Sequence, residues 1–175
     1  MANKIEALEN AINVAQEGAE NVRAQFKDPR DDWAPIVIAL DRKGEISIGL
    51  LDLSDDEAKE LTATKIIPDF IRERKVVALA LVVSAWSLEV PKGETLKVPI
   101  RRSPQRKEIL EIAAMSADST RTLMSDIQRT EIAPPELSEW EELPSNAKLG
   151  GRFVDDIKIA LAEVAKEISN DVHKR

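Results

Sequence analysis

The sequence predicts an α+β fold: a mostly antiparallel sheet of about five strands with a helix on one face, plus N- and C-terminal helices. The main observation is residues 75–90, KVVALALVVSAWSLEV, an almost unbroken apolar run that is shorter than the roughly 20 residues of a membrane helix. Its valines and charged flanks are typical of a central strand buried on both faces. Shorter strand-like runs lie on both sides of it, and apolar residues at helical spacing mark both ends of the chain.

The composition argues against several classes of function. With 175 residues the chain forms one domain with helical extensions, and its net charge of −7 disfavours nucleic acid and anionic membranes as partners. Cysteine is absent, which excludes disulfides, thiolate metal sites and thiol nucleophiles, and the single histidine, His173, lies next to the C-terminus. We therefore expect no catalytic, cofactor-binding or metal-binding residues. Because no apolar leader follows Met1, we expect a cytoplasmic protein.

Residues 2–27 are predicted to form the N-terminal helix. Apolar residues recur there at alternating spacings of three and four, which is an a/d seam over three heptads. The seam consists of Ile5, Leu8, Ile12, Ala15, Ala19, Val22 and Phe26. So narrow a stripe is not stable alone. We therefore expect residues 1–28 to be an association element, with Ile5, Leu8, Ile12, Val22 and Phe26 as its contact residues.

A hairpin and a helix are expected between this element and the central strand. After a polar hinge at 28–35, the residues predict strands at 36–41 and 45–53 joined by a turn at 42–44, where Gly44 can adopt positive φ. Ser54 is expected to cap a helix that runs to about Arg72. Its inward residues are predicted to be Leu61, Ile66, Phe70 and Ile71. Pro68 predicts a kink or break near residues 65–67.

The second half of the chain begins with a loop that runs to about residue 105. Residues 106–115 are compatible with either helix or strand, whereas residues 117–120 predict a turn and 121–130 alternate as a strand does. Residues 131–151 are an acidic, proline-rich and irregular linker. A C-terminal helix is predicted from about 152 to 172, with an apolar stripe of Phe153, Ile157, Leu161, Val164, Ile168 and Val172. The expected segments are thus 1–28, an α+β core at 29–130, the linker at 131–151, and 152–175.

Three short motifs in the core resemble those of a family of small prokaryotic and phage proteins whose activity is not established. The motifs are Ser84, Ala85 and Trp86, then Pro104, Arg106, Glu108 and Ile109, then Ile127 and Arg129. The resemblance covers roughly residues 33–130, and Ser103-Pro104 departs from it where the family pattern has His-Pro. It implies a fold, with 106–115 as a strand, and no activity.

Several residues were weighed as functional candidates. Arg101, Arg102, Arg106 and Lys107 form the dense basic cluster of the sequence, a possible phosphate or nucleic-acid contact that lacks interleaved aromatic residues. A solvated or internally paired face is the preferred interpretation. Asp69 and Glu73 share the letters of a metal-nuclease motif but not its spacing on neighbouring strands.

Carboxylates and tryptophans complete the candidates. Asp41, Asp52 and Glu108 are the carboxylates that are candidates for a metal-dependent site. For Arg106 and Glu108, an ion pair across the sheet is the structural alternative to a functional role. Trp86 is predicted to anchor the core. Trp33 and Trp140, which lie in polar segments, are expected to cover sheet edges or contact a partner.

The expected function is that of a non-catalytic interaction or assembly protein of phage or mobile-element origin. The alternatives are a carboxylate-based metal-dependent enzyme and a weak nucleic-acid binder that uses the 101–107 loop. We expect a homodimer through the terminal helices, with another protein partner also compatible and no membrane partner. Pairing of the two terminal helices within one chain stays open as the other arrangement.

Overall fold

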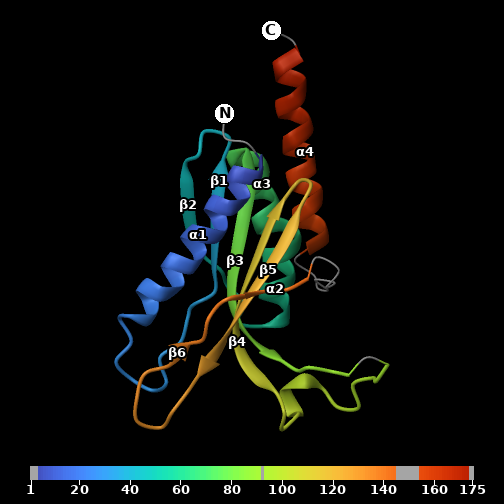
Figure 1. Cartoon of the computed structure of the whole chain (residues 1–175). Helices are drawn as coiled ribbons and strands as arrows, with labels where there is room; N and C mark the ends of the chain where they lie inside the picture. Colours follow the sequence, from blue (N-terminus) through green and yellow to red (C-terminus); the bar gives the residue numbers. More distant parts are fainter. Residues whose placement is uncertain (1–3, 92, 145–153, 174–175) are drawn as a thin grey trace.

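The computed structural model describes residues 4–91, 93–144 and 154–173 and contains a seven-stranded antiparallel sheet (Figure 1). The strand order is β2-β1-β3-β4-β5-β6, and β7 also pairs with β5. The strands are β1 (Ile36–Asp41), β2 (Ile46–Leu50), β3 (Val76–Ser87), β4 (Lys107–Ser116), β5 (Thr120–Gln128), β6 (Glu136–Leu137) and β7 (Glu141–Glu142). The predicted α+β class is confirmed, and the segment 106–115, compatible with helix or strand in the sequence, forms strand β4 apart from Arg106. The additional strands β6 and β7 lie in the segment that was expected to be irregular.

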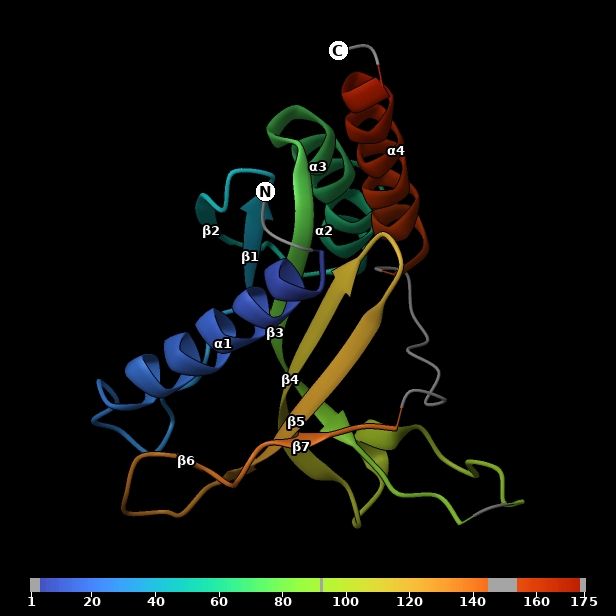
Figure 2. The same cartoon turned by 45° about the horizontal axis from the view of Figure 1, so that its top comes forward.

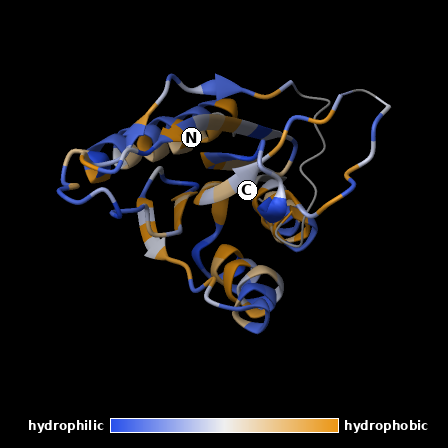
Figure 3. Ribbon diagram, turned by 90° about the horizontal axis from the view of Figure 1, so that it is seen from below, coloured by the Kyte–Doolittle hydropathy of each residue, from blue (hydrophilic) through white to orange (hydrophobic). Residues whose placement is uncertain are grey.

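Helices cover both faces of the sheet (Figure 2). They are α1 (Lys4–Arg23), α2 (Asp56–Leu61), α3 (Ile67–Arg74) and α4 (Val154–His173), with a π-helical turn η1 (Thr62–Ile66) and a 3₁₀ turn η2 (Ile100–Arg102). The ribbon coloured by hydropathy in Figure 3 shows both hydrophobic and hydrophilic residues along the helices. α1 packs on the face that carries Ile38, Ala80 and Ile112, whereas α3 and α4 pack on the face that carries Ala39 and Leu79. The terminal helices therefore lie on opposite faces of the sheet and do not pair with each other. Within the described ranges, no helix has the length and apolar character needed to cross a bilayer.

β3 is the central strand, as predicted. Its first half is buried on both faces because consecutive residues alternate between the two helical layers. Its second half extends beyond the helices (Figure 1), and Trp86 there is 46% exposed. The expectation that Trp86 anchors the core was wrong, because no helical layer covers this end of the strand.

The segment between β2 and β3 corrects two details. The N-cap of α2 is Asp55 rather than Ser54, since the Asp55 carboxylate accepts a hydrogen bond from the Ala58 N–H at 2.8 Å. The expected break is present as the η1 turn, which immediately precedes α3 and its Pro68. The wider π turn rotates the helical face. As a result Thr62, Ala63, Ile67 and Ile71 are buried, Phe70 is half-buried, and Leu61 and Ile66 are exposed, contrary to expectation.

The terminal helices use broader faces than a heptad seam. On α1, Ala7 and Ala11 are buried together with Leu8, Ile12, Ala15 and Ala19, as expected for a helix that lies on a sheet. On α4, Ile157, Leu161 and Val164 are buried and Ile168 is half-buried. Two ion pairs join α3 and its C-cap to α4: Arg72–Glu163 at 2.7 Å and Lys75–Glu167. Phe153 and the side chain of Val172 lie outside the described residues.

Candidate functional site

The far ends of β3, β4 and β5 form an open surface on the face that α3 and α4 cover elsewhere. The pairing register places side chains there in three rows across the strands. These rows are Val83, Glu111 and Met124, then Ala85, Ile109 and Asp126, then Ser87 and Lys107. Apolar and ionisable groups therefore share this face of the sheet, with Ile109 buried, Glu111 and Asp126 half-buried and Lys107 exposed.

A cleft of about 710 Å³ lies on this surface, with the segment 138–143 as one wall. Its apolar lining is Leu88, Ile109, Met124 and Leu143. Its ionisable and hydroxyl lining is Ser87, Glu89, Lys107, Asp126, Ser138, Glu139 and Glu141, with Gln105 beside them. The volume falls in the range of about 300–1,000 Å³ that is usual for ligand sites. We call this site the β3–β5 cleft.

Hydrogen bonds to β5 fix the wall of the cleft. The Asp126 N–H donates to Ser138 Oγ at 2.8 Å, and the Ser138 N–H donates to the Asp126 carbonyl at 3.0 Å. Further along, the Leu143 N–H donates to the Thr122 carbonyl at 2.9 Å. The wall is thus part of the sheet, and the lining side chains are held on a firm backbone.

Carboxylates outnumber the single amine in the β3–β5 cleft. Lys107 Nζ lies 3.7 Å from Asp126 and 3.8 Å from Glu89, and both contacts are open to water, so each is a weak ion pair. Glu139 and Glu141 are exposed on the wall. The lining therefore carries a net negative charge and favours a cationic group in a ligand.

Glu111 lies one position further along the same face of β4 than Ile109. Its side chain is half-buried between the Val83 and Met124 positions of the neighbouring strands, and within the described residues its carboxylate has neither a hydrogen bond nor an ion pair. Burial raises the pKa of the Glu111 carboxyl above its ordinary value. A nearby cation, or protonation, would offset the cost of burying the charge of this carboxylate.

The structure divides the predicted basic cluster. Arg101 and Arg102 are exposed on η2. The guanidinium of Arg106 lies 4.5 Å from the centre of the Trp86 ring and donates to the Ser103 carbonyl. Lys107, by contrast, lines the cleft on the other face of the sheet. The Trp86 ring therefore lies next to the basic cluster in the structure, although the sequence of the cluster contains no aromatic residue.

The carboxylates considered for a metal site do not converge. Asp41 accepts hydrogen bonds from the Lys43 and Glu45 N–H groups. Asp52 accepts one from the Ser54 N–H, and hydrogen bonding by the Ser54 side chain and then by this N–H lowers the pKa of the Asp52 carboxyl. Among residues 4–91, 93–144 and 154–173, no three side chains of the metal-binding types form a group. Asp69 pairs with Arg72 on the exposed side of α3, at 3.4 Å.

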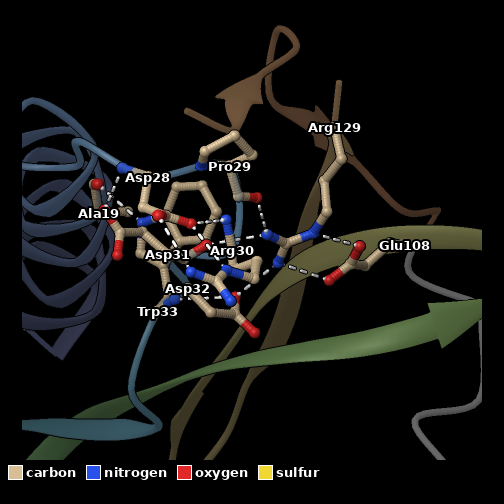
Figure 4. A network of polar contacts seen from close by, with 9 residues as sticks. All are labelled: Ala19, Asp28, Pro29, Arg30, Asp31, Asp32, Trp33, Glu108 and Arg129. Atoms are coloured by element: carbon tan, nitrogen blue, oxygen red, sulfur yellow. Dashed lines mark hydrogen bonds and ion pairs between the residues drawn. The ribbon is translucent and has the colours of Figure 1, made fainter. Parts of the chain in front are cut away.

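Glu108 pairs with Arg129 instead of the expected Arg106 (Figure 4). Arg129 Nε and Nη2 donate to the two carboxylate oxygens of Glu108 at 2.7 and 2.8 Å. The same guanidinium donates to the Pro29 and Asp31 carbonyls and pairs with Asp32. The expected pair was wrong because Arg106 precedes β4 and lies over Trp86. The network anchors the 28–33 loop to the sheet.

The other two tryptophans are structural. Trp33 is buried, donates from Nε1 to the Ala19 carbonyl at 2.9 Å and meets the Phe26 ring edge-on at 4.7 Å. Trp140 is half-buried and packs against the same hydrophobic cluster as α1. Both rings therefore close the α1 side of the sheet.

The residues predicted for self-association make most of their contacts within the chain. Leu8 and Ile12 are buried against the sheet, and Phe26 is half-buried against Trp33. Ile5 and Val22 are exposed. A homodimer through these residues stays a prediction.

Sequence reasoning missed the β3–β5 cleft because its lining comes from four separate segments: 87–89, 105–109, 124–126 and 138–143. The available signal was the presence of Lys107 and Asp126 on the same strand faces as Ile109 and Met124. Comparison of the chain with protein-family models, curated proteins and solved structures gives no match. The resemblance seen in residues 33–130 therefore stays a prediction.

Proposed function

We propose that this protein is a non-catalytic interaction protein whose β3–β5 cleft binds a short peptide segment of a partner protein. The segment carries a basic side chain next to aliphatic ones. The observation that carries the proposal is the combination of an apolar floor with a rim in which carboxylates outnumber the single amine, Lys107.

The floor supports recognition of aliphatic side chains. Ile109 and Met124 are diagonal neighbours on β4 and β5, because the register pairs Ile109 with Asp126 and Glu111 with Met124. Leu88 and Leu143 line the cleft with them. Methionine is unbranched and polarisable, so it adapts to ligand side chains of different shapes. Burial of aliphatic groups here supplies the non-directional part of the binding energy.

The rim supports recognition of a basic side chain. A lysine or arginine beside Asp126, Glu139 and Glu141 meets three carboxylates that β5 and the adjoining wall supply, whereas an acidic side chain meets repulsion from the same groups. The half-buried Glu111 adds a second carboxylate position next to the floor. Charge therefore contributes specificity, and apolar contact contributes affinity.

A displayed library of random peptides, selected on the intact chain, tests this proposal. We expect enrichment of peptides in which Lys or Arg adjoins Leu, Ile, Val or Met. For an enriched peptide carrying a fluorescent label, anisotropy should show at least tenfold weaker binding to a Glu139→Lys/Glu141→Lys double variant. The matched control is Glu57→Lys/Glu131→Lys, which changes the same number of exposed charges outside the cleft.

Two results would contradict the proposal. One is the absence of any enriched sequence class. The other is equal binding of the enriched peptide to the cleft variant and to the control variant, which would place the peptide elsewhere on the surface.

Binding of single-stranded nucleic acid is a second candidate function, favoured by the contact of Arg106 with the exposed Trp86 ring. Arg101 and Arg102 lie in the preceding turn, so an aromatic ring and three guanidinium groups belong to one region. The net charge of −7 opposes this function.

If the protein binds single-stranded nucleic acid here, a fluorescein-labelled dT12 oligonucleotide should bind the wild type in a salt-dependent manner, and Trp86→Ala should weaken this binding. Absence of binding at 50 mM salt would eliminate this candidate.

A further inference from the structure

β2 is an edge strand with a free hydrogen-bonding side. It pairs only with β1 among the described strands (Figure 1). The Asp41 N–H donates to the Glu45 carbonyl at 3.1 Å, and the Leu51 N–H donates to the Pro35 carbonyl at 2.9 Å. Because bonded pairs alternate in an antiparallel ladder, the residues between them point their N–H and C=O groups away from β1. These residues are Ile46, Ile48 and Leu50.

The same three residues expose their side chains on one face. Ile46 is 46%, Ile48 63% and Leu50 79% exposed. They lie opposite Leu40, Ile38 and Ile36 of β1, on the α1 side of the sheet. Edge strands usually carry a proline, a charged residue or a bulge that prevents pairing with another chain. β2, with the sequence ISIGL and an unshifted register to β1, has none of these features.

We propose that β2 pairs antiparallel with β2 of a second copy of this chain, with Ile48 on the two-fold axis. In this register Ile48 lies opposite Ile48 of the other copy, and Ile46 lies opposite Leu50. The outward N–H and C=O groups of all three residues then form bonded pairs. Their side chains form one continuous aliphatic ladder, and the two sheets become a single sheet.

The charges that flank β2 favour a second copy in this orientation. The turn before the strand carries Arg42 and Lys43 between Asp41 and Glu45, whereas the segment after the strand carries Asp52 and Asp55 and has no basic residue up to residue 58. The side chains of Arg42, Lys43, Asp52 and Asp55 are exposed. Antiparallel pairing about Ile48 places the basic turn of each copy beside the acidic segment of the other. Parallel pairing would place like charges together. Arg42 and Lys43 therefore favour the antiparallel arrangement, in which they lie beside the acidic segment of the other copy.

This interface is independent of the β3–β5 cleft. β2 and the cleft strands β4 and β5 lie on opposite sides of β3 in the strand order. A dimer through β2 leaves both clefts open on one extended sheet. Such a dimer increases the apparent affinity for a partner that carries two copies of the recognised segment.

The absence of native cysteine allows a test of the register. In the proposed dimer the Cα atoms of a bonded pair lie about 5.5 Å apart, within the range of a disulfide. We therefore expect Ile48→Cys to form a covalent dimer under mild oxidation. Ile46→Cys is the matched control, since its counterpart lies four residues along the strand, about 14 Å away at roughly 3.4 Å per residue. A chain carrying both Ile46→Cys and Leu50→Cys should form the dimer again.

Sedimentation velocity over a range of concentrations gives a second test. We expect Ile48→Lys to shift the wild-type chain from dimer to monomer, whereas Ile159→Lys, at an exposed isoleucine of α4, leaves the dimer intact. Arg42→Glu/Lys43→Glu and Asp52→Lys should each weaken dimerisation at least tenfold, and mixing these two chains should restore it. A monomeric wild type at 100 μM, or covalent dimers of Ile46→Cys as abundant as those of Ile48→Cys, would overturn the proposal.

Discussion

Arg129, directly after β5, holds Glu108 on β4 in a bidentate ion pair, with Nε–Oε2 at 2.7 Å and Nη2–Oε1 at 2.8 Å. The guanidinium also donates to two carbonyls of the 29–31 segment, so one side chain ties the sheet to the loop that carries Trp33. The Glu108 side chain is only 18% exposed. The pair is therefore better shielded from water than the other ion pairs of the described surface.

Arg129→Ala should lower the free energy of unfolding by about 2 kcal/mol, because it leaves a poorly exposed carboxylate and two carbonyls without their donor. Urea denaturation provides the measurement. Arg129→Lys keeps the charge but cannot form the fork, so it should recover less than half of the loss. Full recovery by lysine would show that charge rather than geometry stabilises the loop.

Trp86→Ala should cost about 1 kcal/mol, less than the 3–5 kcal/mol expected for a buried aromatic residue. The ring is half exposed, and its main polar contact is the Arg106 guanidinium. Leu79→Ala, at a fully buried position of the same strand, is the comparison and should cost about 2–5 kcal/mol. Equal losses for the two variants would mean that the Trp86 end of β3 is covered in solution.

The sequence was sufficient to predict β3 because its apolar run is long and its first half contacts both helical layers. It was insufficient for Trp86, since exposure at the end of a strand depends on where the covering helices stop. The buried face of the 54–72 segment differs from the predicted one because a π turn inserts one residue into the helical repeat. Helix propensities of the residues do not indicate such an insertion. The apolar seam of residues 5–26 predicts that this helix packs against a partner, but it does not identify the partner. In the structure the partner is the sheet of the same chain.

The β3–β5 cleft required the pairing register of β3, β4 and β5. Lys107 follows Arg106 directly, and both were assigned to one basic cluster. Neighbouring residues in or next to a strand point to opposite faces, so the two side chains belong to different surfaces. Glu139 and Glu141 lie in a segment predicted to be irregular, and the position of Glu141 opposite Met124 follows from the β5–β7 pairing.

Leu8→Ala should lower the free energy of unfolding by about 2–4 kcal/mol, whereas Ile5→Ala should change it by less than about 0.5 kcal/mol. Both residues belong to the predicted association seam, but only Leu8 is buried against the sheet. The urea midpoint is measured in the Ile48→Lys background, so that pairing through β2 does not contribute. Packing within one chain makes the loss independent of protein concentration. A loss that grows on dilution would instead support association through α1.

Glu111→Gln should stabilise the protein at neutral pH, with a gain that disappears in acid. Burial raises the pKa of Glu111 in the folded state, whereas in the unfolded chain it stays near about 4.3. Between these two values the folded state binds more protons than the unfolded state, so this group lowers stability as the pH rises through the folded pKa. Glutamine removes the buried charge, and the advantage should be full above the folded pKa and absent below about pH 4. The measurement is the difference between the unfolding free energies of variant and wild type from pH 4 to pH 8.

Glu57→Gln, at an exposed carboxylate of α2, is the control and should show no such trend. If Glu111→Gln were less stable than the wild type at pH 8, the Glu111 carboxylate would have a stabilising partner in solution, and its place as an unpaired group beside the cleft floor would be wrong.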